Sequence, residues 1–262
     1  MLWIYRSKVL IMYNQKPSMT VRYEINPPKI SDDDQDARNV LSERIKAISS
    51  VCDGIHLTDS VLGIPRVSPF EIAKQIRESD KNIKLTCSLR VRDKNLNDIE
   101  KIVRQSIGTV DGILVLMGDK SDAMSSKAEL IPSQVVKSLN DNGLGKKLEL
   151  FLSIPGNPNF VKIQKKIDAK PAGFFTQVIH SKEQIEKISD RLGSNGFKII
   201  PCLLLPSQNN SKSAEFLKID WSNYKENISG FINEIHSITG DILITSPNDF
   251  KRAYETISKL AI

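Results

Sequence analysis

Short runs of β-branched and aliphatic residues recur eight times along this chain, and stretches with a helical pattern separate them. Strands that alternate with helices pair as a parallel sheet, because each helix carries the chain back to the start of the next strand. Eight such units in about 240 residues match the (β/α)8 barrel in number and in size. We therefore predict an α/β fold of the (β/α)8 TIM-barrel type. The strand-like runs are residues 20–25, 54–58, 83–88, 112–117, 148–154, 173–178, 198–204 and 241–245.

The stretches between the runs carry apolar residues at the helical period. The second of them begins with a capping box at Ser68 to Glu71, with proline in the first turn. An open doubly wound sheet is the alternative fold, but Asn26 to Pro28 stand where such a sheet carries a glycine-rich phosphate-binding turn. We expect a binding loop or lid at 118–132 and a mobile loop at 207–213. The predicted helices are 36–50, 68–78, 97–106, 133–139, 160–167, 182–192, 224–236 and 247–260.

The first eighteen residues precede this pattern. They are apolar but include Arg6 and Lys8, and they fall short of the roughly 20 residues that a membrane span needs. Met19 stands directly before the first strand-like run. We predict that residues 1–18 form an N-terminal extension, disordered or packed on the barrel, and that residues 19–262 form the catalytic barrel domain.

Composition narrows the class of protein. The 262 residues carry a formal net charge of +6, but Lys and Arg are spread over the predicted helices instead of alternating with aromatic residues in one stripe, which argues against nucleic-acid binding. Cys52, Cys87 and Cys202 are isolated from one another, as in a reducing compartment. Cys52 and His56 have half of a metal-site spacing with no second half. We expect a cytoplasmic protein without a metal, a membrane partner or a nucleic-acid partner.

Polar residues stand at the ends of several predicted strands. Glu24 ends the first, Thr58 and Asp59 the second, Asp119 follows the fourth, and Gln177 ends the sixth. The carboxyl ends of barrel strands meet at one face, where active sites of this fold lie. The sequence therefore predicts that these side chains converge.

Two of these carboxylates suit different roles. Glu24 lies among apolar residues and prolines, where low dielectric raises the pKa of a carboxyl group and fits it to donate a proton. Asp119 lies between Gly118 and Lys120, which suits a permanent anion. The structural alternatives are an edge carboxylate that binds backbone amides for Glu24, and a turn cap for Asp119.

Other ionisable residues are predicted to be structural or solvent-exposed. His56, His180 and His236 are isolated, as hydrogen-bonded core or surface histidines usually are. Arg90 and Arg92 are expected to be solvated, although either can in principle reach an anionic ligand.

Six segments, in order, resemble the successive motifs of methylenetetrahydrofolate reductases, and the resemblance covers roughly residues 19–260. The family's barrel holds FAD, which passes a hydride to the methylene carbon that bridges two nitrogens of a folate. The resemblance implies reduction of 5,10-methylenetetrahydrofolate or a related pterin to the 5-methyl form, in one-carbon metabolism and methionine biosynthesis, with NAD(P)H or another electron donor. The six segments are YEINPPK, HLTDS, KLTC, LVLMGD, KKIDAKPAGFFTQ and IIPCLLLP.

The resemblance also implies roles for single residues. Glu24 matches the general acid that protonates the leaving nitrogen. Asp119 matches the carboxylate that contacts the substrate and stabilises the iminium cation, and Gln177 matches a side chain that reads the folate. Five residues match cofactor-binding positions, namely Thr58, Lys84, Gly118, Asn157 and Lys166.

Departures from the family pattern occur mainly at positions that hold the flavin in the family. Lys84 stands in place of a histidine, Met117 in place of an arginine, and Asn157 in a segment that normally reads tyrosine-proline-glutamate. We therefore expect weakened flavin binding. The alternative is a flavin-poor or flavin-free pterin-binding homologue, acting as a subunit of a redox or methyl-transfer complex. The partners to expect are a small-molecule folate or pterin and, for the protein itself, a second copy or a redox partner subunit. A lyase or aldolase barrel is a third possibility, but neither Lys84 nor Lys166 is marked as a Schiff-base lysine.

Overall fold

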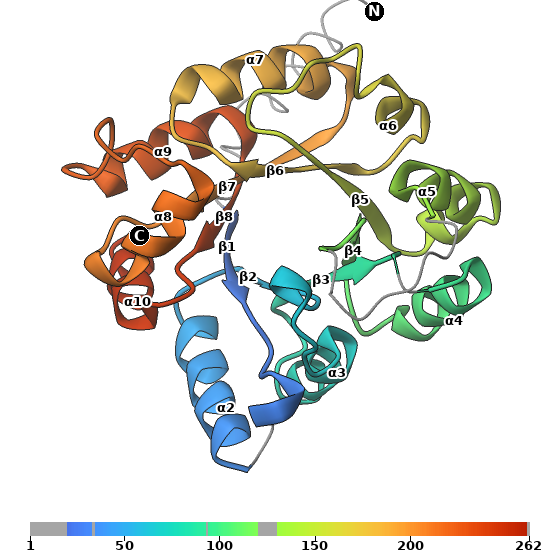
Figure 1. The fold of residues 1–262 in the computed structure, drawn as a ribbon, viewed down its shortest axis with the longest axis horizontal. Helices are drawn as coiled ribbons and strands as arrows, with labels where there is room; N and C mark the ends of the chain where they lie inside the picture. The colour runs from blue at the N-terminus through green and yellow to red at the C-terminus, as the bar shows by residue number, and fades with distance from the viewer. Residues whose placement is uncertain (1–19, 33–34, 93, 120–129, 261–262) are drawn as a thin grey trace, which may run out of the picture.

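A computed structural model describes residues 20–32, 35–92, 94–119 and 130–260. Eight parallel strands close into a barrel in the order of the chain, and the helices form a ring outside it (Figure 1). The predicted (β/α)8 fold is confirmed. The strands are β1 (Thr20–Ile25), β2 (Gly54–Leu57), β3 (Lys84–Arg90), β4 (Gly112–Leu116), β5 (Glu149–Ile154), β6 (Gly173–Val178), β7 (Lys198–Leu204) and β8 (Asp241–Thr245).

The helices follow the predicted order, with shifts at three of them. The predicted helix at 160–167 is helical only from Gln164, the one at 224–236 begins at Ile228, and the one at 247–260 covers Phe250 to Ser258. No helix in the described part of the chain is both long and apolar enough to cross a membrane. The helices are α2 (Gln35–Ser49), α3 (Pro69–Ser79), α4 (Leu96–Ser106), α5 (Pro132–Asp141), α6 (Gln164–Asp168), α7 (Lys182–Leu192), α8 (Ser211–Leu217), α9 (Ile228–Thr239) and α10 (Phe250–Ser258).

The prediction of a mobile loop at 207–213 is wrong. A 3-10 turn (Gln208–Asn210) leads directly into α8 there. Asn210 is fully buried, and its amide nitrogen donates to the Leu205 carbonyl oxygen at 3.0 Å and to Ser246 Oγ at 2.8 Å. Burial and hydrogen bonding of one side chain thus order a segment whose Ser and Asn content suggested a loop. The N-terminal extension and residues 120–129 of the predicted lid lie outside the described residues.

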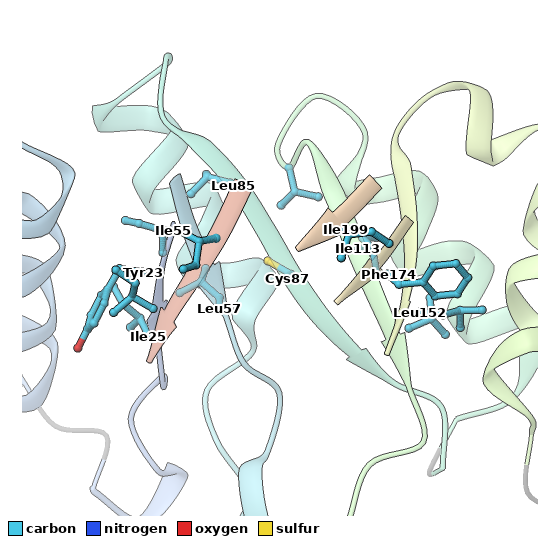
Figure 2. Packing of buried hydrophobic residues seen from close by; sticks show 14 of the residues in the cluster. Tyr23, Ile25, Ile55, Leu57, Leu85, Cys87, Ile113, Leu152, Phe174 and Ile199 are labelled. Atoms are coloured by element: carbon cyan, nitrogen blue, oxygen red, sulfur yellow. The ribbon is translucent and has the colours of Figure 1, made fainter. Parts of the chain in front are cut away.

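The two faces of each strand pack against different parts of the molecule. Outward-facing residues such as Tyr23, Ile55, Leu85 and Phe174 pack beneath the helices in the main hydrophobic core (Figure 2). Inward-facing residues fill the barrel in layers taken from alternate strands, as in other TIM barrels. A smaller apolar cluster inside the barrel comprises Leu114, Phe151, Phe175, Ile200, Cys202 and Leu243.

The amino-terminal end of the barrel is closed by a buried ion pair. Arg22 donates from Nε and Nη2 to the two carboxylate oxygens of Asp241, at 2.8 and 2.7 Å. Glycine at the start of β2 leaves room for this side chain, since a Cβ on Gly54 would lie 3.3 Å from the Arg22 Cγ. This end is therefore part of the scaffold, and the opposite end is left for function.

Candidate functional site

Glu24 points into the barrel near the carboxyl end of β1. The side chain is half-buried, and Thr245 Oγ1 on β8 donates to Glu24 Oε1 at 2.7 Å. Burial raises the pKa of the Glu24 carboxyl group, and the hydrogen bond from Thr245 opposes that shift in part. The protonated form is thereby stabilised, so this carboxyl group is suited to donate a proton.

Glu24 belongs to a polar layer of inward-facing residues. Alternation along β1, β3, β5 and β7 places Glu24, Ser88, Ser153 and Cys202 on the inner face in one layer, and Cys202 also belongs to the apolar cluster. Burial chiefly, and the Glu24 charge secondarily, raise the pKa of the Cys202 thiol. Thr245, Ser88, Ser153 and Cys202 were not among the site residues predicted from the sequence. Their position in the alternation of each strand is the signal that would have found them.

Gln177 lies on the same side of the mouth as Cys202. The pairing of β6 with β7 shifts register between Phe175 and Val178, and Thr176 Oγ1 accepts the Cys202 backbone N–H at 3.0 Å. Gln177 sits in this irregularity with an exposed side chain. Such bulges re-aim side chains and are frequent beside active sites. Gln177, Cys202, Thr245 and Glu24 therefore follow one another around the mouth on β6, β7, β8 and β1.

Asp119 occupies the other side of the mouth and is engaged with backbone. The carboxylate is exposed, and Oδ2 accepts the Leu62 N–H at 2.8 Å. This is the turn-cap alternative, now with its partner identified. Among the described residues, no hydrogen bond joins Asp119 to Glu24.

Arg90, at the end of β3, joins the loops after β2 and β4 at this side. Only 3% of the residue is exposed, so the expectation that it is solvated is wrong. The guanidinium group donates to the Ser60 carbonyl oxygen at 3.2 Å and to the Asp119 carbonyl oxygen at 3.1 Å. Gly118 makes room for it, because a Cβ there would lie 2.5 Å from Arg90 Nε. The role that the structure shows for Gly118 is thus to admit Arg90.

Of the remaining predicted cofactor residues, Thr58 lies at the end of β2, whereas Lys166 and Asn157 lie at the end of β5. Thr58 Oγ1 donates to Asn26 Oδ1 at 2.7 Å, between the ends of β2 and β1. Lys166 Nζ donates to the Ser153 carbonyl oxygen at 2.5 Å, and burial lowers the pKa of that amine. Asn157 is exposed and accepts from Lys187 Nζ at 3.4 Å.

Lys84 is at the wrong end of the barrel for the predicted site. The residue begins β3, its Nζ donates to Thr20 Oγ1 at 3.2 Å, and it lines a cavity of about 730 Å³ at the amino-terminal end, together with Arg22 and Asp241. The sequence motif K-L-T-C placed Lys84 near a strand end without showing which end. Because β3 starts here, the side chain is separated from the carboxyl-terminal mouth by the length of the strand.

His56 is a core residue, as predicted. Its ring nitrogens lie 2.9 Å from Thr86 Oγ1 and 3.0 Å from Ser88 Oγ, and burial lowers its pKa to about 3. The imidazole is therefore neutral at physiological pH. Among the described residues no group of three His, Cys, Asp or Glu side chains is placed to hold a metal ion.

Comparison with known proteins shows the fold. No protein-family model and no curated protein sequence matches the chain. A protein from Clostridium thermocellum, described as binding two copies of 5-methyl-5,6,7,8-tetrahydrofolic acid, is similar with a TM-score of 0.64 at 17% identity, over 98% of each chain. 2,3-Dimethylmalate lyase, of the PEP mutase/isocitrate lyase superfamily, is similar at 0.55 and 12%, over 99% of this chain and 83% of its own. Oxaloacetate acetylhydrolase is similar at 0.57 and 11%, over 97% and 83%.

Proposed function

We propose that this protein binds a reduced folate or a related tetrahydropterin at the carboxyl-terminal mouth of the barrel, and that Glu24 is the acid that protonates it. The observation that carries the proposal is the inward-facing Glu24 carboxyl group, whose pKa is raised by burial. The ordered resemblance to methylenetetrahydrofolate reductases and the fold shared with a 5-methyltetrahydrofolate-binding protein support the same ligand class.

The chemistry assigned to Glu24 is the opening of a methylene bridge between two nitrogens. The neutral carboxyl group gives its proton to the leaving nitrogen while the carbon–nitrogen bond breaks, and the bonding electron pair stays on that nitrogen. A cationic iminium and the Glu24 carboxylate result. The amide of exposed Gln177 can both donate and accept hydrogen bonds, and we propose that it forms hydrogen bonds with the polar edge of the pterin.

The resemblance also implies that a flavin reduces the iminium. The five residues expected to hold FAD do not all lie at one site. Lys84 lies at the opposite end of the barrel, Gly118 is covered by Arg90, and Asn157 is exposed next to Lys187. We derive no step through a flavin. These placements favour the pterin-binding homologue with little or no flavin over the flavoenzyme.

Titrations by calorimetry and by absorbance test the proposal. Calorimetry of the wild-type protein with 5-methyltetrahydrofolate is expected to show saturable binding, and 2,3-dimethylmalate, a ligand suggested only by a lyase of the same fold, is expected to show none. Absorbance titration with FAD and with FMN is expected to show weak or absent binding. No heat with 5-methyltetrahydrofolate would contradict the proposed function, whereas tight binding of either flavin would restore the flavoenzyme.

A further inference from the structure

The turn after β2 has an unusual backbone. Four described residues other than glycine have a positive φ, and two of them, Ser60 at 46° and Leu62 at 58°, fall in this turn, followed by Gly63 at 71°. A side chain with a Cβ pays a steric cost in this left-handed region, and the cost is higher for bulky residues than for Asn or Gly. Strained backbone persists only where the surroundings hold it, and it gathers at ligand-binding sites.

Hydrogen bonds from two other strands hold the turn. Asp119, after β4, accepts the Leu62 N–H at 2.8 Å, and Arg90, at the end of β3, donates to the Ser60 carbonyl oxygen at 3.2 Å. The turn therefore reaches from β2 past β3 to the loop after β4.

The same contacts place the turn at the rim of the barrel mouth. Arg90 has the same parity along β3 as Thr86 and Ser88, whose hydroxyl groups contact His56 inside the barrel. Because this side chain binds both Ser60 and Asp119, the backbone of the turn lies next to the carboxyl-terminal end of β3.

Leu62 gains little from burial to offset this strain. The residue is 58% exposed. Single exposed leucines are common on protein surfaces, but this one sits at a strained position that a carboxylate and a buried arginine maintain.

We propose that Leu62 supplies the apolar surface against which the ring system of the ligand packs, and that Asp119 and Arg90 are positioning residues that hold Leu62 there. This inference rests on the proposed binding of a reduced folate or pterin. It changes the role of Asp119, which acts through the hydrogen bond to the turn and not through its negative charge.

Two substitutions of Asp119 separate these roles. The amide oxygen of Asp119→Asn can still accept the Leu62 N–H, whereas Asp119→Ala has no acceptor. Calorimetry with 5-methyltetrahydrofolate is expected to show affinity within about threefold of wild type for Asp119→Asn and a loss of about tenfold for Asp119→Ala. Equal losses for both variants would assign the effect to the charge and overturn the positioning role.

Leu62 and the nearby Ile64 form a matched pair for the contact itself. Ile64 is also exposed but has an ordinary φ of −77°. Leu62→Ala is expected to lower affinity by about five- to tenfold, and Ile64→Ala by less than twofold. Unchanged affinity in Leu62→Ala, with wild-type binding intact, would overturn this inference alone. Absence of binding by the wild type would overturn the proposed function and the Leu62 contact together.

Thermal unfolding without ligand tests the strain. Glycine normally destabilises relative to alanine, but at a left-handed position the order is reversed. We therefore expect a higher Tm for Leu62→Gly than for Leu62→Ala, and a lower Tm for Ile64→Gly than for Ile64→Ala. The same order at both positions would show that the turn is unstrained and would remove the reason for the proposal.

Discussion

The two sides of the barrel mouth use their polar residues differently. On the β2–β4 side, the side chains of Asp59, Arg90 and Asp119 bind backbone groups of neighbouring strands and loops. On the β8–β1 side, the Glu24 carboxyl group accepts one hydrogen bond, from Thr245, in surroundings that favour its protonated form.

This difference shows that position at a strand end does not by itself make a residue reactive. A carboxylate that accepts a hydrogen bond from the backbone of a turn serves as structure. A carboxyl group that faces a barrel interior with few partners keeps its proton to higher pH. The β2–β4 side is therefore the scaffold of the proposed site, and the β8–β1 side is its chemical part.

Glu24→Gln gives the largest expected effect. Opening of the methylene bridge of 5,10-methylenetetrahydrofolate, followed as the 5-methyltetrahydrofolate formed when cyanoborohydride in solution transfers hydride to the iminium, is expected to slow by about 10²- to 10⁴-fold. Affinity for 5-methyltetrahydrofolate is expected to change little. Glu43→Gln, on the exposed face of α2, is the control and is expected to behave as wild type. Full activity in Glu24→Gln would show that Glu24 is not the proton donor. The β8–β1 side of the mouth would then not be the chemical part of the site.

Arg90→Met tests the scaffold side. Two carbonyl oxygens lose a charged donor in a buried setting, so the free energy of unfolding is expected to fall by about 2–4 kcal/mol. Arg92→Met is the matched control, because half-buried Arg92 donates to the Gly118 carbonyl oxygen at 2.9 Å; we expect a loss of about 1 kcal/mol. Urea unfolding of the two variants measures the difference, and equal losses would contradict the special role of Arg90.

Glu24 also makes stability depend on pH. Its pKa is raised in the folded state, so the folded protein binds more protons than the unfolded chain above the ordinary Glu pKa of about 4.3. Stability is then lost as pH rises from that value through the folded pKa. Glu24→Gln should raise Tm by a few degrees at pH 7–8 and have no such advantage below pH 4. A Tm difference that does not depend on pH would exclude a raised pKa.

Thr245→Val is expected to have a smaller effect on the same carboxyl group. Removal of the hydroxyl donor takes away a bond that favours the charged form, so the pKa of Glu24 should rise further. The alkaline limb of the pH–rate profile should move to higher pH, with the maximal rate reduced by less than about tenfold. Thr245→Ser keeps the donor and should retain the wild-type profile. A limb that moves to lower pH would contradict the assignment.

Lys84→Ala is expected to have the smallest effect on ligands. Its amine lies at the amino-terminal end of the barrel, so affinity for 5-methyltetrahydrofolate should stay within about twofold of wild type. Calorimetry measures this affinity. A marked loss would show that Lys84 contributes to the ligand site in spite of its position.

The fold could be predicted from the strand pattern because apolar periodicity depends only on residues that are close together in the sequence. β1, β6, β7 and β8 begin and end where the sequence predicts, since each is an apolar run bounded by Gly, Pro or a polar residue. α9 starts later than predicted because Asn227 caps it by accepting the Gly230 N–H. The order at 207–213 was missed because it depends on Asn210 reaching residues far along the chain.

The sequence by itself determined that the chain forms a (β/α)8 barrel and that Glu24 stands at the end of its first strand. Only the tertiary structure decided which polar residues share a surface. Glu24 meets Thr245 across 221 positions of sequence, and Asp119 meets Leu62 across 57, because closure of the sheet brings distant strand ends together. Whether a carboxylate keeps its proton or caps a turn depends on those neighbours, since desolvation and hydrogen-bond partners set its pKa.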